Sequence, residues 1–284
     1  MILWVAVLLG VVQGLFMFVP VSSTSHLALT QHWLDGIGVE IPPAESPEMI
    51  LFDLVLHVGT LVSIAVVFRE RITQIAFDSI GELRRGGARG SPARGADSAL
   101  TLVGLLALAT AVTGVLGLGV RAAAPAVFSE PSIIAIMLVV TGAILWWTDS
   151  ANPVGALRPT VLMAVGIGVA QAAALLPGLS RSGLTIAAAL ALGMRREQAA
   201  EFSFILAIPT ILAATGVQAL DVMGSGGTDI SLVAMGVGFW VAALVGIGAL
   251  VIVLRLLYAA RFRIFSFYVW ALAGVVLVTG VGTA

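Results

Sequence analysis

Apolar stretches long enough to cross a lipid bilayer recur along the whole chain, and they restrict its fold more than any other feature. Crossing about 30 Å of hydrocarbon takes a helix of roughly 20 residues. Charged side chains make up only 10% of the 284 residues, and the mean hydropathy is +1.10, whereas typical soluble domains carry about 25% charged residues. We therefore expect an all-α integral membrane protein with a single polytopic domain over residues 1–284.

Six stretches are predicted to be continuous transmembrane helices, and two further segments are broken. The six cover residues 50–68, 98–120, 132–148, 200–221, 231–254 and 264–282. Segments 2–33 and 159–193 are interrupted by proline, glycine and hydroxyl residues, at VPVSSTSHL and LPGLSRSGLT. Non-helical backbone at membrane depth survives only where protein or a water-filled cavity satisfies its polar groups. Each broken segment is therefore predicted to be a re-entrant pair of half-helices.

The basic residues predict the orientation, and all 14 of them are arginines. Arginines in short loops favour the cytoplasmic side. If loop 34–49 lies outside the cell, twelve fall inside: Arg69, Arg71, Arg84, Arg85, Arg89, Arg94, Arg158, Arg195, Arg196, Arg255, Arg261 and Arg263. Arg121 then lies outside, and Arg181 lies within the second broken segment. This arrangement predicts a multi-pass protein of the plasma membrane with both termini outside.

The chain contains a duplicated unit. GVVQ at 10–13 matches GVAQ at 168–171, and a proline and a Ser-x-Ser follow each copy. FDLVLHVGTL from Phe52 aligns with FSFILAIPTI from Phe202. The repeats span about 1–120 and about 159–284, and the predicted orientation inverts one relative to the other. In transporters, inverted repeats bring broken helices tip to tip near the midplane, so we expect the two polar breaks to build one cavity.

The second break has the residues of an anion site. Pro177 and Gly178 end one half-helix, and Ser180 or Ser182 caps the next, which leaves free backbone N–H groups at a positive helix end. Arg181 adds a planar charge suited to bidentate phosphate recognition. Arginine at membrane depth costs roughly 2.5 kcal/mol or more unless a cavity or counter-charge receives it. The structural alternative is that Arg181 reaches an interface or pairs with a carboxylate and only holds the fold.

The first break offers nucleophiles and a proton carrier. Ser22, Ser23, Thr24 and Ser25 supply hydroxyls, and His26 can move protons near neutral pH. The histidine could act as base to a serine or attack phosphorus itself, and spacing alone does not decide between them. The hydroxyls could instead cap half-helices or satisfy helix contacts.

Other polar residues inside apolar runs are weaker candidates. Asp53 and His57 lie one turn apart on one helical face, where they could bind a divalent cation, orient Arg181 or sit at an interface. Glu201 begins the equivalent helix of the second repeat, and we expect a structural role for it near the inner interface. Gln13 is a candidate ligand, whereas Gln171 is expected to bond exposed hairpin backbone.

These motifs resemble those of the undecaprenyl-diphosphatase family, also called the bacitracin-resistance proteins. The first motif is matched at Gln13, Gly14, Phe18, Pro20, Val21, Ser22, Ser23, Thr24, His26 and Leu27. The second is matched at Pro177, Gly178, Ser180, Arg181, Ser182, Gly183 and Thr185. The segments from Phe52 and from Glu201 are also similar, so the likeness covers nearly the whole chain.

The resemblance implies an inverted-repeat membrane fold and hydrolysis of a C55 polyprenyl diphosphate to the monophosphate and inorganic phosphate, which recycles the cell-wall lipid carrier. It places the reaction on the outer side, typically with Mg²⁺ or Ca²⁺. By position, Arg181 would hold the phosphates, and Ser23 or His26 would be nucleophile or base. The implied substrate-binding residues are Gln13, Ser22, Thr24, Ser25, Gly178, Ser180, Ser182 and Thr185, and the metal candidates are Gln13 and Asp53.

The partners implied are the polyprenyl diphosphate and membrane lipids, with apolar grooves receiving the prenyl chain. A net charge of -1 argues against nucleic acid. The absence of cysteine excludes disulfides, thiolate metal sites and a cysteine nucleophile. The sequence leaves the oligomeric state open, including a homodimer.

One position departs from the family motif, because Met17 stands where the family has glutamate. Methionine neither binds Mg²⁺, a hard ion that prefers oxygen ligands, nor transfers a proton. If the family's metal rests mainly on that glutamate, the protein is slow, metal-independent, reliant on Asp53, or not a hydrolase. The alternatives to the phosphatase are a transporter of lipid phosphates that uses the same anion site and a catalytically silent binding homologue. We expect Met17→Glu to raise the rate markedly in Mg²⁺.

Overall fold

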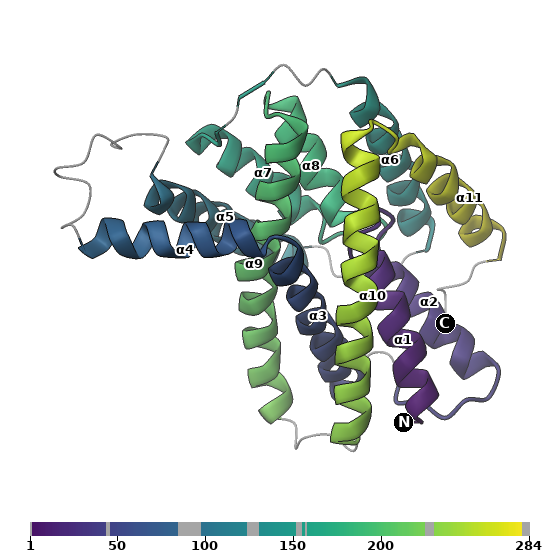
Figure 1. Cartoon of the computed structure of the whole chain (residues 1–284). Coiled ribbons are helices and arrows are strands. Elements are labelled where there is room, and N and C mark those ends of the chain that lie inside the picture. The colour runs from purple at the N-terminus through teal and green to yellow at the C-terminus, as the bar shows by residue number, and fades with distance from the viewer. Residues whose placement is uncertain are drawn as a thin grey trace.

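The computed structural model is helical throughout the part of the chain that it describes (Figure 1). The described residues are 2–43, 46–84, 98–123, 131–151, 155–156, 158–224 and 230–279. Their helices are α1 (Leu3–Phe16), α2 (Ser23–Gly36), α3 (Pro47–Val67), α4 (Arg69–Arg84), α5 (Ala99–Ala123), α6 (Pro131–Ser150), α7 (Val161–Ala173), α8 (Arg181–Ala191), α9 (Arg196–Gly224), α10 (Leu232–Tyr258) and α11 (Arg263–Thr279). The predicted all-α class is confirmed.

Five helices are long and apolar enough to cross a membrane: α3, α5, α6, α9 and α10. They correspond to five of the six predicted spans. The sixth predicted span, 264–282, falls on α11, which has 17 residues and is shorter than the others. Residues 280–282 lie outside the described residues, as do Arg85, Arg89 and Arg94 of the predicted inner arginines. The chain is a multi-pass helical membrane protein by the length and composition of these helices.

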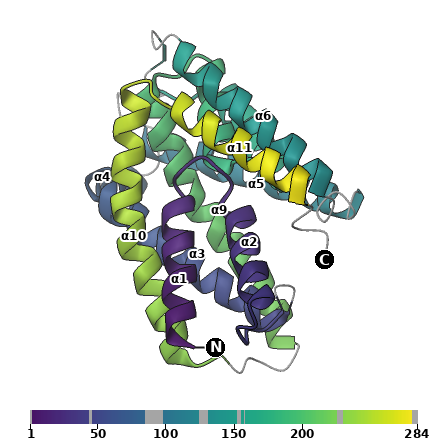
Figure 2. The ribbon, with the colours of Figure 1, turned by 90° about the vertical axis from the view of Figure 1, so that its right-hand side faces the viewer.

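Both broken segments consist of two short helices. The first is α1 and α2, which we call the first hairpin, and the second is α7 and α8, the second hairpin. The non-helical residues 17–22 form the first tip. The second tip consists of the non-helical residues 174–180 together with the first two residues of α8, Arg181 and Ser182. Figure 2 shows the first tip as a loop near the centre of the molecule. The breaks therefore fall where proline and glycine predicted them.

Close helix packing joins the two halves of the chain. Helix α1 lies along α10, and α7 lies along α5. A Cβ on Gly10 of α1 would stand 2.8 Å from the carbonyl oxygen of Gly238 and 3.1 Å from the side chain of Val241. A Cβ on Gly168 of α7, the matching glycine of the second copy, would stand 2.8 Å from the carbonyl oxygen of Ala109. The two glycines thus permit the same backbone approach at equivalent places.

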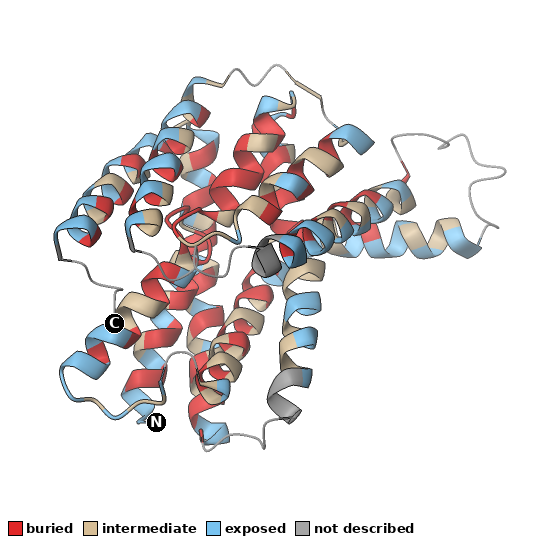
Figure 3. Cartoon of the chain, turned by 180° about the vertical axis from the view of Figure 1, so that it is seen from behind, coloured by how far each residue is buried: buried red, intermediate tan, exposed pale blue. Residues whose placement is uncertain are grey.

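The buried residues gather where the two hairpins and the long helices cross (Figure 3). Phe18 of the first tip is fully buried and packs edge-on against Phe204 of α9, with ring centroids 5.9 Å apart. The largest apolar cluster contains both rings together with Met17 and Ile186 of α8. The core therefore encloses the region between the two tips and fixes their separation.

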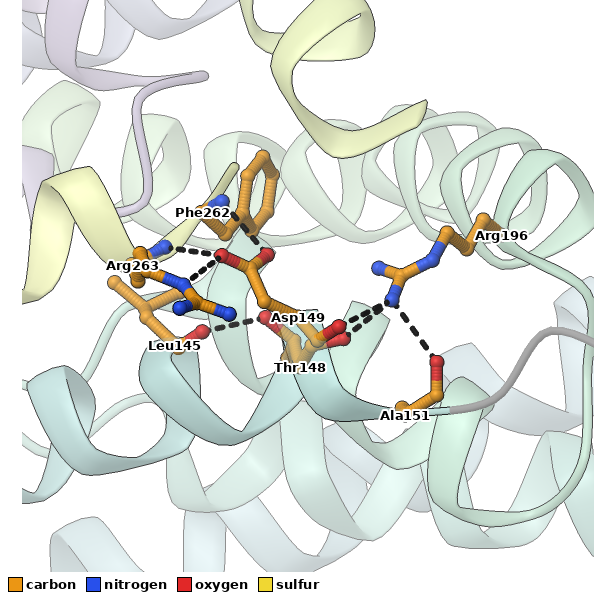
Figure 4. A network of polar contacts seen from close by, with 7 residues as sticks. All are labelled: Leu145, Thr148, Asp149, Ala151, Arg196, Phe262 and Arg263. Atoms are coloured by element: carbon orange, nitrogen blue, oxygen red, sulfur yellow. Dashed lines mark hydrogen bonds and ion pairs between the residues drawn. The ribbon is translucent and has the colours of Figure 1, made fainter. Parts of the chain in front are cut away.

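A polar network at the end of α6 sets the direction of α11 (Figure 4). The buried carboxylate of Asp149 accepts hydrogen bonds from the backbone N–H groups of Phe262 and Arg263, at 2.7 and 2.8 Å. These are N–H groups at the start of α11 that have no partner within their own helix. Arg196 of α9 donates to three carbonyl oxygens at the end of α6, at 2.8–3.2 Å. One cluster thus joins the ends of three helices.

Candidate active site

The second tip is shaped by a glycine that no other residue replaces easily. Gly178 has φ +91°, and a Cβ there would stand 2.5 Å from the carbonyl oxygen of Ile134. The hydroxyl of Thr141 on α6 donates to the carbonyl of Gly178 at 2.9 Å and accepts from the N–H of Ser180 at 3.2 Å. Gly178 is therefore needed for the backbone conformation of the tip, whatever contact it makes with a substrate.

Helix α8 begins at this tip with a side-chain cap. The Ser180 hydroxyl accepts from the N–H of Gly183 at 3.2 Å and lies 3.4 Å from the hydroxyl of Ser182. The Thr185 hydroxyl donates to the carbonyl of Arg181 at 2.9 Å and is fully buried, so it is engaged within its own helix. The Ser180 hydroxyl therefore serves as the N-cap of α8, and the Thr185 hydroxyl bonds to a backbone carbonyl one turn earlier in the same helix.

The two tips touch each other through Met17 and Phe18. The Arg181 guanidinium donates through Nη2 to the thioether sulfur of Met17 at 3.4 Å. The Ser182 hydroxyl donates to the carbonyl oxygen of Phe18 at 3.4 Å. In the described part of the chain no carboxylate pairs with Arg181. The alternative that Arg181 only stabilises the fold through an ion pair therefore has no support among these residues.

The first tip turns through a strained residue. Ser22 has φ +69° and precedes α2 without capping it through its side chain. Its hydroxyl lies 3.0 Å from that of Ser25, and both residues are buried. Ser23 is partly exposed and Thr24 is exposed. The accessible hydroxyls at this helix start therefore belong to Ser23 and Thr24.

His26 is held on both ring nitrogens. Nδ1 lies 2.7 Å from the carbonyl oxygen of Ser22, and Nε2 lies 2.7 Å from the hydroxyl of Tyr268 on α11. Phe16 stacks on the imidazole with ring centroids 3.9 Å apart. The sequence motifs did not indicate Tyr268, and its only signal was a hydroxyl within a largely apolar span.

The remaining polar candidates have definite partners. Gln31 of α2 donates to both carboxylate oxygens of Asp53 at 3.1 and 3.2 Å, and Nδ1 of His57 lies 2.8 Å from the Asp53 carbonyl. Gln171 donates to the hydroxyls of Thr113 and Thr210, at 3.1 and 3.0 Å. The expectation that Gln171 bonds hairpin backbone is therefore wrong, because its amide Nε2 donates to side chains of α5 and α9.

Glu201 forms an ion pair with Arg71 of α4, with 2.6 Å between Oε1 and Nε. This pair fits the structural role expected of the glutamate. It ties the start of α9 to α4, a helix that the sequence analysis did not predict.

The donor set does not suit a hard divalent cation held by the protein alone. Such ions prefer carboxylate and other oxygen ligands. Near Arg181 the chain offers the sulfur of Met17, to which the Gln13 amide donates at 3.6 Å. The buried Oε1 of Gln13 is an oxygen without a partner. Among the described residues, no three His, Cys, Asp or Glu side chains gather into a metal-sized group.

Comparisons with known proteins find relatives along nearly the whole chain. Residues 6–275 match the family model described as "Bacitracin resistance protein BacA". A protein of Halorhodospira halophila named undecaprenyl-diphosphatase is 51% identical over 98% of this chain and 97% of its own length. Proteins of the same name from Alkalilimnicola ehrlichii and Desulfosudis oleivorans are 50% and 40% identical, each over at least 95% of both chains. The chain belongs to the bacitracin resistance protein family.

Proposed function

We propose that this protein hydrolyses undecaprenyl diphosphate to undecaprenyl phosphate and inorganic phosphate and so recycles the lipid carrier of cell-wall synthesis. Membership of the family and the shared name of its relatives support the activity. The observation that carries the proposal is Arg181, which starts α8 at the contact of the two tips and has no carboxylate partner in the described chain. A diphosphate supplies the counter-charge that this guanidinium lacks.

The position of each residue indicates its role in the proposed reaction. Arg181 and the backbone N–H groups at the start of α8 neutralise the phosphates. Leaving-group departure from a diphosphate needs charge neutralisation more than covalent chemistry, so these groups contribute most of the catalysis. Ser23 or His26 supplies the nucleophile or base, and Thr24 and Ser182 assist. Gln13 offers its unpartnered carbonyl oxygen to the reacting groups.

We assign no step to a metal ion held by the chain. The family resemblance implies Mg²⁺ or Ca²⁺, which would lower the negative charge of a diphosphate. The sulfur of Met17 does not provide the oxygen that either ion prefers. Arg181 is therefore the principal group that stabilises negative charge in the proposed site.

The proposed arrangement is an inverted repeat with two re-entrant hairpins. Support comes from Gly10 and Gly168, which occupy matched positions of the two copies and face matching carbonyl oxygens at the same 2.8 Å. Support also comes from the lengths of the four hairpin helices, which range from 11 to 14 residues, too few for the roughly 20 of a full crossing. The site then faces the outer side of the plasma membrane with both termini outside, as the arginine distribution predicts.

The decisive test is Arg181→Ala in purified protein, assayed for phosphate release from undecaprenyl diphosphate in detergent. We expect kcat/KM to fall at least about 100-fold, because a main stabiliser of developing charge is removed. Arg69→Ala is the matched control, since Arg69 is a surface arginine with a side chain 73% exposed, and its activity should stay at the wild-type level.

Two results would contradict the proposal. One is wild-type turnover in Arg181→Ala. The other is lipid movement across vesicle membranes by the wild-type protein without any phosphate release, which would identify a transporter.

A further inference from the structure

The hydroxyl of Tyr268 points at the imidazole of His26 from a helix that carries none of the recognised motifs. The oxygen lies 2.7 Å from Nε2, and the two rings lie nearly parallel with centroids 5.7 Å apart. Tyr268 is 43% exposed. An exposed tyrosine on a membrane helix normally turns its hydroxyl toward water at the interface, whereas this one turns inward to a histidine.

The hydrogen bonds of His26 determine which nitrogen holds the proton. Nδ1 faces the carbonyl oxygen of Ser22 at 2.7 Å. A carbonyl can only accept, so Nδ1 must carry a hydrogen. In the neutral imidazole, Nε2 is then the unprotonated nitrogen, and the Tyr268 hydroxyl donates to it. The basic atom of His26 is therefore the atom that Tyr268 holds.

A phenol suits this place in both protonation states of the imidazole. While Nε2 is unprotonated, the Tyr268 hydroxyl donates to it. Because Nε2 has a single lone pair, the O–H of the bound nucleophile replaces the Tyr268 hydroxyl as its donor. Once that proton has passed to Nε2, the new N–H donates to the phenol oxygen, which can also accept. Phe16 covers one face of the imidazole at 3.9 Å. The ring keeps its orientation through a proton transfer because each state has a complete set of partners.

The anchoring of α11 helps to fix the position of Tyr268 beside His26. Tyr268 lies about one and a half turns beyond Arg263, where the carboxylate of Asp149 binds the first N–H groups of the helix. The position of the hydroxyl is thus set in part by α6, a helix outside the hairpin that carries His26, while Phe16 and Val21 of the first hairpin also pack against α11. Such support from a separate rigid element is typical of residues that orient a catalytic side chain.

We propose that Tyr268 is the positioning residue of His26, which fixes its Nδ1–H tautomer and holds Nε2 in the orientation that the reaction uses. The inference rests on the proposed function, in which His26 acts as base or nucleophile. It adds a residue from outside both hairpins to the catalytic apparatus.

The kinetic test compares Tyr268→Phe with Tyr258→Phe, which removes the only other tyrosine hydroxyl of the chain. Tyr258 is 44% exposed, so the two changes are closely matched. For Tyr268→Phe we expect kcat to fall about 10-fold or more, out of the roughly 100- to 10,000-fold that general acid–base catalysis contributes. KM should stay within about twofold because uniform substrate binding is unchanged. Tyr258→Phe should match the wild type.

A second pair of variants tests whether Tyr268 acts through His26. In a His26→Gln background, adding Tyr268→Phe should cause no further loss of kcat. A further loss as large as that in the wild-type background would overturn the proposal, as would wild-type kcat in the single Tyr268→Phe variant.

Nitrogen-15 NMR of histidine-labelled protein tests the contact without any turnover. The chain has three histidines, and loss of one signal pair in His26→Gln assigns His26. We expect a protonated Nδ1 and an unprotonated, hydrogen-bonded Nε2 in the wild type, with the Nε2 signal shifting in Tyr268→Phe but not in Tyr258→Phe. A protonated Nε2 with unprotonated Nδ1 in the wild type would overturn the proposal. Absence of phosphate release by the wild-type protein would refute the proposed function and leave this measurement intact.

Discussion

Met17 lies where the two tips meet, and its sulfur faces both polar groups that reach this point. Arg181 Nη2 stands 3.4 Å away and Gln13 Nε2 3.6 Å away. A thioether is a weak acceptor without charge, so it leaves the positive charge of the guanidinium unbalanced. A carboxylate in the same place would balance that charge and compete with a phosphate for it.

Met17→Glu therefore changes two properties of the site together. Without metal, the new carboxylate pairs with Arg181 and should lower the rate. With Mg²⁺, the carboxylate and the unpartnered Oε1 of Gln13 provide oxygen ligands, and the rate should rise markedly above that of the wild type. Phosphate release measured over a titration of Mg²⁺ against EDTA checks this expectation.

Met17→Gln is the control for Met17→Glu, since it introduces an oxygen of similar reach without charge. It should show no comparable gain with Mg²⁺. If the response of the rate to Mg²⁺ were unchanged in Met17→Glu, another group would already supply the oxygen ligand that the glutamate adds.

At the residue scale the sequence singled out the polar residues of the two breaks but did not indicate their partners. Arg181 and His26 could be found because polar groups within apolar runs are conspicuous. Tyr268 could not, since 242 positions separate it from His26 in the sequence and α11 carries no motif. The internal bond of Thr185 was equally hidden, because a hydroxyl that faces its own helix and one that faces a ligand look alike in sequence.

At the scale of single helices, α11 depends on a carboxylate from another helix. Asp149→Ala should lower the free energy of unfolding by about 2 kcal/mol, since it removes the acceptor of two N–H groups at the start of α11, one of them on the buried Phe262. Arg263→Ala is the control because its side chain is 51% exposed, and a pair of this kind contributes at most about 1 kcal/mol. Thermal unfolding in detergent measures both, and equal losses would contradict this account of the network.

The boundaries of the helices show what local sequence can and cannot predict. Proline and glycine predicted both breaks because they act on the backbone directly. Helix α4 was missed, since its charged residues resemble those of a loop and only Ile75 among its side chains is buried. The predicted span at 264–282 begins within one residue of α11, and its last three residues lie outside the described residues.

At the scale of the whole molecule, packing between the halves rests on equivalent glycines. Gly10→Ala and Gly168→Ala should each lower the free energy of unfolding by about 1–3 kcal/mol, because each Cβ would stand 2.8 Å from a carbonyl oxygen of the facing helix. Gly114→Ala on α5 is the control, since a Cβ there meets nothing within 4 Å, and it should be neutral or stabilise the helix by up to about 1 kcal/mol. Thermal unfolding of the three variants compares them, and a loss confined to one half would contradict an equivalent role.

The packing of α1 along α10 also determines when α1 can reach its final contacts during synthesis. Helix α7 emerges from the ribosome after its partner α5, so the second hairpin finds a surface already in place. Helix α1 is made first, yet the helix that it packs against is almost the last to appear. Helix α1 therefore reaches its final packing late in synthesis, and a nascent chain that stops before α10 leaves it without the helix along which it lies.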